Sequence, residues 1–98
     1  MKLIFAWDAN KARANLRKHR VSFEEAKTAF NDPLLLTYPD EPHSETEERY
    51  CSIGYSNQNR VLLVSHTEQV NGEELLIRII SSRKATTAER KKYEDPTA

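Results

Sequence analysis

Three cations near the C-terminal end of the chain have the residue types and the spacing to bind an anion. Arg78 stands between two isoleucines of an apolar stretch, and Arg83 and Lys84 follow where that stretch ends. Thr86 and Glu89 have the spacing of a capping box, which predicts that a helix begins there. Cations at a strand exit beside a helix N-terminus suit a phosphate group. A core strand with a satisfied arginine, followed by a solvated helix, is the competing interpretation.

His66 is the next residue with useful chemistry. It follows the apolar run at residues 61–65, and strand alternation places it on the same face as Leu62 and Val64. An imidazole at a strand end, next to an arginine-bearing strand, can transfer a proton near neutral pH. A buried histidine that is hydrogen-bonded to the backbone fits the same pattern equally well.

These residue types can supply the parts needed for RNA cleavage without a metal ion, although the sequence forces no two of them into contact. One group takes the proton from the 2′-hydroxyl, another gives a proton to the departing 5′-oxygen, and cations stabilise the phosphate between them. We therefore predict His66, Arg78 and Arg83 as catalytic residues. Tyr93 or Glu48 would assist if the fold brings either one close.

A second group of cations is predicted to contact the substrate. The first predicted helix ends on a basic cluster at residues 17–20, and cations at a helix C-terminus also stabilise the helix dipole by about 0.3–1 kcal/mol each. A structural role is therefore the alternative for that cluster. The predicted substrate contacts are Lys18, His19, Lys84 and Arg90.

Metal and nucleotide cofactors are not predicted. The three histidines lie far apart in the sequence, and the single cysteine, Cys51, cannot form a C-x-x-C pair. With only two glycines, the chain also has no glycine-rich loop for a phosphate.

Length and composition indicate one domain over residues 1–98. The lone cysteine suits a reducing cytosol, and no segment is long and apolar enough for a signal sequence or a membrane span, so we expect a cytoplasmic protein. The net charge of zero hides a segregation, because residues 1–30 carry seven Lys and Arg against three Asp and Glu, whereas residues 31–59 carry one against six. A local basic face is therefore compatible with a neutral molecule.

The pattern of apolar residues predicts an α+β domain. A strand at residues 3–7 precedes a helix that Asp8 caps, and Ser22 with Glu25 forms a second capping box. Four strands follow at about 34–38, 49–55, 60–67 and 75–81, and a last helix spans 86–93. Short turns between consecutive strands favour a mainly antiparallel sheet, in the order β-α-α-β-β-β-β-α.

Several short stretches, in order along nearly the whole chain, resemble the BrnT family of toxins from bacterial type II toxin–antitoxin systems. The resemblance rests on Phe5-Ala6-Trp7-Asp8 with Lys11, Asn15, Lys18 and His19; Val21-Ser22-Phe23-Glu24-Glu25-Ala26; His43-Ser44-Glu45 with Glu47-Glu48-Arg49 and Ile53-Gly54; His66-Thr67-Glu68; Ile77-Arg78-Ile79-Ile80-Ser81; and Arg83-Lys84-Ala85-Thr86 with Glu89-Arg90 and Tyr93-Glu94.

This resemblance implies a RelE/ParE-like fold and a ribonuclease that inhibits translation. It also implies a BrnA-like ribbon-helix-helix antitoxin that neutralises the toxin, with operator DNA bound only through the complex. The chain departs from the family pattern at Arg20, where relatives tend to have glycine, and at Gln69 and Ser82. A left-handed helix cap is costlier for arginine, so we expect either a different turn or a longer helix there.

Two functions of other classes remain open on the sequence. A toxin of this fold can instead bind a target protein such as gyrase without cleaving anything, because a fold does not fix a function. An inactive domain that serves only in promoter repression is the third interpretation.

Overall fold

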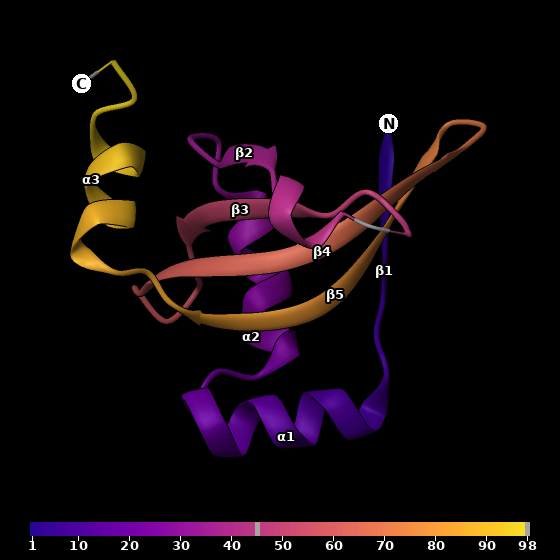
Figure 1. Cartoon of the computed structure of the whole chain (residues 1–98), viewed down its shortest axis with the longest axis horizontal. Helices are drawn as coiled ribbons and strands as arrows, with labels where there is room; N and C mark the ends of the chain where they lie inside the picture. The colour runs from indigo at the N-terminus through magenta and orange to yellow at the C-terminus, as the bar shows by residue number, and fades with distance from the viewer. Residues whose placement is uncertain (45, 98) are drawn as a thin grey trace.

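The computed structural model describes residues 1–44 and 46–97, and Glu45 of the acidic loop, which also belongs to the family resemblance, lies outside the described residues. The five strands form one sheet, and the helices pack against it (Figure 1). In chain order they are β1 (Lys2–Ala6), α1 (Ala9–His19), α2 (Phe23–Thr28), the short 3-10 helix η1 (Ala29–Asn31), β2 (Leu36–Pro39), the 3-10 helix η2 (Glu41–His43), β3 (Tyr50–Tyr55), β4 (Val61–Asn71), β5 (Glu74–Lys84) and α3 (Thr87–Glu94).

The sheet is mixed, with the strand order β1-β5-β4-β3-β2. The three pairs formed by consecutive strands are antiparallel, whereas β1 runs parallel to β5. The α+β class is therefore confirmed, and the parallel pair departs from a purely antiparallel sheet. A parallel pair needs a long connection, and here everything from α1 to β4 lies between β1 and β5 in the chain.

The two faces of the sheet carry separate hydrophobic cores. One face, which we call the helix face, is packed against α1, α2 and η1 (Figure 1). Its core contains Val21, Phe23 and Ala26 from the helical side, and Leu62, Val64, Ile77 and Ile79 from the sheet. The opposite face, the open face, is covered at one end by α3, where Tyr93 packs with Cys51, Ile53, Val61 and Leu63.

Helix ends follow the local sequence signals in most places. The side chain of Asp8 caps α1, accepting from the Lys11 N–H at 2.9 Å, and the capping box of Thr86 and Glu89 is complete. The Ser22 side chain caps α2, but Glu25 does not complete the predicted box, since its carboxylate binds elsewhere. Helix α1 ends at His19, and Arg20 adopts the left-handed conformation with φ of 59°, so the expectation of a different turn or a longer helix at this arginine was wrong.

Asn15 fastens α1 to the sheet where β1 no longer covers β5. Strand β1 pairs only with the first half of β5, up to Arg78. Beyond it, the Asn15 side chain donates to the Ser82 carbonyl at 2.8 Å and accepts from the Ser82 N–H at 3.1 Å, and it also donates to the Val21 carbonyl. The C-terminal end of α1 is thereby held beside the C-terminal end of β5. No helix in the described part of the chain is both long and apolar enough to cross a membrane.

Candidate active site

A β-bulge in β5 decides which side chains share a face. Ser65 pairs with Ser81, but the next residue, His66, pairs with Ile79, so one residue of β5 has no partner in the ladder. Cross-strand partners lie on the same face of a sheet. Arg78 pairs with Thr67 and Arg83 with Leu63, and both arginines therefore lie on the open face although five positions separate them. A regular strand would place them on opposite faces.

Arg83 is held at the end of β5 by the first turn of α3. Its Nη1 and Nη2 donate to the two carboxylate oxygens of Glu89 at 2.7 and 2.9 Å. This two-pronged pair raises the pKa of Arg83 and lowers that of Glu89 to about 2. The Glu89 carboxylate also accepts from the Thr86 N–H at 2.8 Å, so one side chain both caps α3 and orients the guanidinium. Because 38% of the Arg83 side chain stays exposed, an anion can still reach it.

A pocket of about 340 Å³ opens in front of Arg83. Its walls come from the end of α1, from β2, η2, β3, β4 and β5, and from α3. The side chains with acid–base or hydrogen-bonding chemistry that line it are His19, Tyr38, Asp40, His43, Cys51, Ser65, Ser81, Ser82, Arg83 and Glu89. Burial raises the pKa of both Tyr38 and Cys51, so neither is poised to lose a proton near neutral pH.

Two of the three histidines meet at this pocket. His19 is the last residue of α1, whose position Asn15 fixes, and His43 is the last residue of η2. His43 Nδ1 lies 2.9 and 3.1 Å from the two carboxylate oxygens of Asp40. The loop is held by the Ser44 hydroxyl, which donates to the Asp40 carbonyl at 2.8 Å. Because Nδ1 is hydrogen-bonded to Asp40, Nε2 of His43 is the nitrogen that can exchange a proton with a ligand.

His66 lies on the opposite face of the sheet from Arg83. Its side chain is fully buried, it pairs with Ile79 of the helix-face core, and Phe30 and Tyr50 pack against its ring. Nε2 is 2.7 Å from the Ser52 hydroxyl, and burial lowers the pKa of the imidazole to about 4. The alternation that puts His66 with Leu62 and Val64 is confirmed. That same face is closed by helices, so His66 is not brought together with Arg83.

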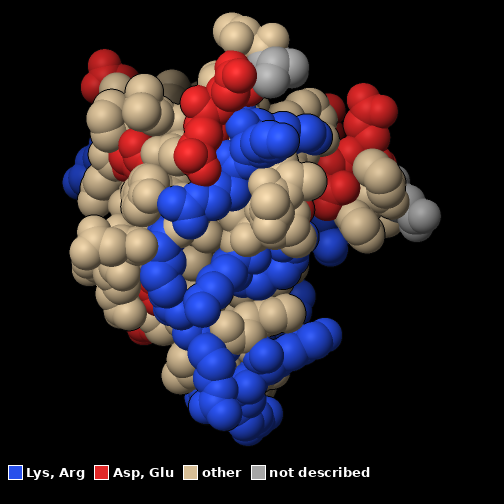
Figure 2. All heavy atoms as spheres, turned by 90° about the vertical axis from the view of Figure 1, so that its left-hand side faces the viewer, with Lys and Arg blue, Asp and Glu red and all other residues tan. Residues whose placement is uncertain are grey.

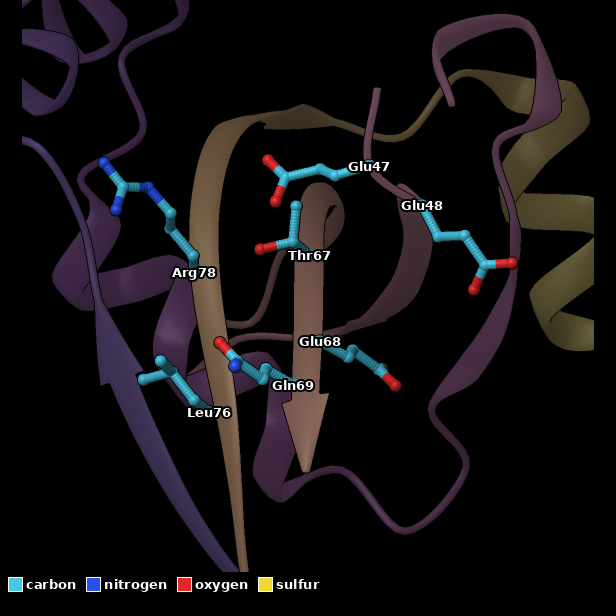
Figure 3. A pocket seen from close by; sticks show the side chains of 7 residues that line it. All are labelled: Glu47, Glu48, Thr67, Glu68, Gln69, Leu76 and Arg78. Atoms are coloured by element: carbon cyan, nitrogen blue, oxygen red, sulfur yellow. The ribbon is translucent and has the colours of Figure 1, made fainter. Parts of the chain in front are cut away.

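Arg78 lines a second pocket, of about 390 Å³, beyond the bulge (Figure 3). Glu47, Glu48 and Glu68 line it as well, so this surface carries more acid than base. Glu48 accepts a hydrogen bond from the Tyr50 hydroxyl at 2.9 Å. Arg78 and Arg83 therefore share a face but belong to different pockets.

None of the remaining predicted residues lines the first pocket. Lys18 is exposed beside His19, and Lys84 pairs with Leu62, which directs it to the helix face at the end of β5. Arg90 is on α3, where it binds Glu94 and the Tyr55 hydroxyl. Tyr93 donates to Asp32 and does not line this pocket. Figure 2 shows that Lys and Arg side chains form a band on this side of the molecule, from the level of α1 up to that of α3.

Sequence reasoning missed Tyr38, Asp40 and His43 as site residues. A local signal existed, because Asp40 and His43 are three positions apart, a spacing that allows a carboxylate–imidazole pair in one helical turn. No local signal indicated that these residues line the same pocket as Arg83, because they are far from Arg83 in the sequence. Among residues 1–44 and 46–97 there is no group of three or more His, Cys, Asp or Glu side chains placed to hold a metal ion.

Comparison with known proteins identifies the family of this chain. The crystal structure of the Brucella abortus ribonuclease toxin BrnT, determined at 1.1 Å resolution, is similar to this chain with a TM-score of 0.62, at 22% identity over 89% of this chain and 100% of that one. A search of curated proteins finds no significant match. The family model described as the ribonuclease toxin BrnT of type II toxin–antitoxin systems matches residues 7–89. The chain therefore belongs to the BrnT family of ribonuclease toxins of type II toxin–antitoxin systems.

Proposed function

We propose that the protein cleaves RNA in the pocket in front of Arg83, without a metal ion. The observation that carries this proposal is the meeting of one guanidinium and two imidazoles at a single open pocket. These are the groups that the reaction needs, namely a cation for the phosphate, a base and an acid.

In the proposed reaction, Arg83 binds the scissile phosphate and His43 takes the proton from the 2′-hydroxyl. Asp40 stabilises the imidazolium that forms, because its carboxylate contacts Nδ1. The 2′-oxygen attacks phosphorus while the bond to the 5′-oxygen breaks, and His19 gives its proton to that leaving oxygen. The products are a 2′,3′-cyclic phosphate and a 5′-hydroxyl, so atoms and charges balance.

Arg78 and His66, both predicted as catalytic from the sequence, receive different parts in this proposal. Arg78 lies on the same face as Arg83, one bulge away, but it shares its pocket with Glu47, Glu48 and Glu68, so the proposal assigns it no contact with RNA. His66 is assigned a supporting role inside the sheet, since a fully buried ring cannot contact RNA unless η1 and Tyr50 move.

The basic band supplies the path for RNA on either side of the scissile bond. Lys18 flanks His19 and Arg90 lies on the next helix, while Lys84 follows Arg83 in β5 with its side chain on the helix face at the strand end. Each phosphate that such a cation neutralises on single-stranded RNA should contribute about −0.7 to the slope of log affinity against log salt.

The wider biology is proposed from the family. A type II toxin implies an antitoxin, and we propose a BrnA-like ribbon-helix-helix protein that neutralises this chain. In the resulting complex, the antitoxin binds operator DNA. Cleavage of RNA in the cytoplasm would inhibit translation when the antitoxin is lost. A relationship to RelE/ParE toxins belongs to the same proposal.

The test is RNA cleavage by purified, antitoxin-free protein in excess EDTA, with and without ribosomes. Arg83→Lys keeps the charge but loses the two-pronged geometry, and His43→Asn keeps a polar side chain without a proton-transfer group. Each change should lower the single-turnover rate by about 100-fold or more. Arg13→Lys, on the exposed side of α1, is the matched control and should cleave normally.

Three outcomes would contradict the proposal. Intact RNA under all conditions would exclude cleavage, and capture of gyrase by the same protein would then favour the protein-binding alternative. An absence of toxicity with normal antitoxin binding would favour the inactive repression module. Activity that is lost in EDTA and restored by a divalent ion would refute the metal-free mechanism alone.

A further inference from the structure

Strand β4 continues well beyond the end of its neighbour β3. Tyr50, the first residue of β3, pairs with His66, and no later residue of β4 pairs with β3. On its other side, β4 stays paired with β5 as far as Asn71. Residues 67–71 therefore have a ladder partner on one side only, as far as the structure describes the chain. A strand edge of this kind offers its free N–H and C=O groups to another extended segment.

This edge is acidic. Figure 3 shows that Glu48 and Glu68 lie on the side of β4 that faces away from β5, and that Glu47 extends over Thr67. Arg78 is the one cation among the residues that line this pocket, and it is on β5, on the far side of β4 from the free edge. Three carboxylates beside the edge repel a nucleic-acid backbone and attract a cationic side chain.

A buried polar atom at the start of the free edge strengthens this reading. His66 Nδ1 has no hydrogen-bond partner among the described residues, although the side chain is fully buried. It lies 3.8 Å from a carboxylate oxygen of Glu68.

The same edge also presents an apolar residue. Val70 is 66% exposed, and it shares a face of β4 with Glu68 because the two are two positions apart. A neighbouring strand would therefore match this face with a cation opposite Glu68 and an apolar residue opposite Val70.

We propose that a lysine- or arginine-bearing extended segment of the antitoxin adds to β4 as a sixth strand along residues 67–71. Charge disfavours RNA as the occupant. It also disfavours a second copy of this chain, because pairing two identical edges would bring their glutamates together. This inference rests on the antitoxin partner given under the proposed function, and it is independent of the cleavage chemistry.

Backbone hydrogen–deuterium exchange tests the added strand directly. The toxin is compared alone and in complex with its antitoxin, and the amides of residues 67–71 that face the free edge should exchange at least about tenfold more slowly in the complex. Unchanged exchange at these residues, with protection confined to the Arg83 pocket, would overturn the proposal. Failure of the wild-type proteins to form a complex would overturn it too.

A pair of matched variants tests the role of charge. Glu47→Gln with Glu68→Gln should weaken antitoxin binding about fivefold, because each exposed ion pair contributes about 0.5 kcal/mol. Glu24→Gln with Asp95→Asn removes the same net charge from exposed sites elsewhere and should leave the affinity unchanged. Equal effects of the two pairs would mean that only overall charge matters and would refute a specific docking edge. Cleavage of RNA by each variant, measured without antitoxin, separates this outcome from a failure of the ribonuclease proposal.

Discussion

The burial of His66 makes the stability of the fold sensitive to mild acid. The imidazole has a pKa of about 4 in the folded protein against an ordinary value of 6.5, because burial disfavours its charged form. Between those two values the unfolded chain binds a proton that folded His66 does not. The contribution of neutral His66 to the free energy of unfolding is therefore fully present above about pH 6.5 and is lost as the pH falls toward 4.

The size of this effect follows from the two values. Linkage gives a loss of about 2 kcal/mol in the free energy of unfolding between pH 7.5 and pH 5. Among the described residues, the ring contacts the uncharged side chains of Phe30, Tyr50 and Ser52, and its Nδ1 lies 3.8 Å from a carboxylate oxygen of Glu68. Burial raises the pKa of Glu68, and a raised carboxyl pKa acts with the opposite sign, stabilising the fold as pH falls.

Urea unfolding of wild type and His66→Gln at a series of pH values separates the two contributions. Glu68 is present in both proteins, so the difference between their curves isolates His66. That difference should shrink by about 2 kcal/mol from pH 7.5 to pH 5. Folded His66→Gln should also retain its cleavage rate.

Parallel curves for wild type and His66→Gln would contradict a lowered pKa of His66, because the imidazole would then titrate alike in the folded and unfolded states. If the variant does not fold, the wild-type ring gives the same information by NMR. Its carbon-bound protons should keep their neutral-form shifts above about pH 5, and a midpoint near 6.5 would be the contradicting result.

Three further substitutions probe how the pocket is held. Asn15→Ala should lower the free energy of unfolding, measured in urea, by about 2–4 kcal/mol, because it leaves the buried N–H and carbonyl of Ser82 without a partner. A loss under 1 kcal/mol would show that Asn15 does not hold α1 against β5. Gly54→Ala should destabilise by about 1–3 kcal/mol, since an added Cβ would lie 3.0 Å from a backbone oxygen and 2.8 Å from a leucine methyl; an unchanged melting temperature would contradict this close packing. Glu89→Gln should remove the acid-dependent loss of stability between pH 4.5 and about 2 and release Arg83, and an unaltered acid-unfolding profile would argue against the ion pair.

Local signals in the sequence predicted most of the elements. Asp8 before the first helix and the Thr86–Glu89 pair before the last are caps whose partners lie within three residues, so sequence alone defines them. Glu25 shows the limit of such signals. Its spacing to Ser22 suggested a second capping box, but Arg60 and Ser56, more than thirty residues away, offer its carboxylate stronger partners.

The site was harder to predict because it is assembled from distant segments. His19 ends α1 and His43 ends the 3-10 helix η2, and neither stands near Arg83 in the sequence. They meet because Asn15 ties α1 to the part of β5 that β1 leaves uncovered. The parallel β1–β5 pair that leaves this gap is itself a non-local contact, which strand periodicity does not encode.

The bulge between β4 and β5 explains why His66 is separated from Arg78 and Arg83, the other two residues predicted as catalytic. Strict alternation from Ile79 would place Arg83 on the helix face with His66 and leave Arg78 alone on the open face. One unpaired residue in β5 reverses the alternation, which carries Arg83 to the open face and keeps His66 inside. No residue at this point is a glycine or proline that would mark a bulge. The bulge is instead favoured by burial, because after it Ser82, bonded to Asn15, lies on the helix face and the guanidinium of Arg83 does not.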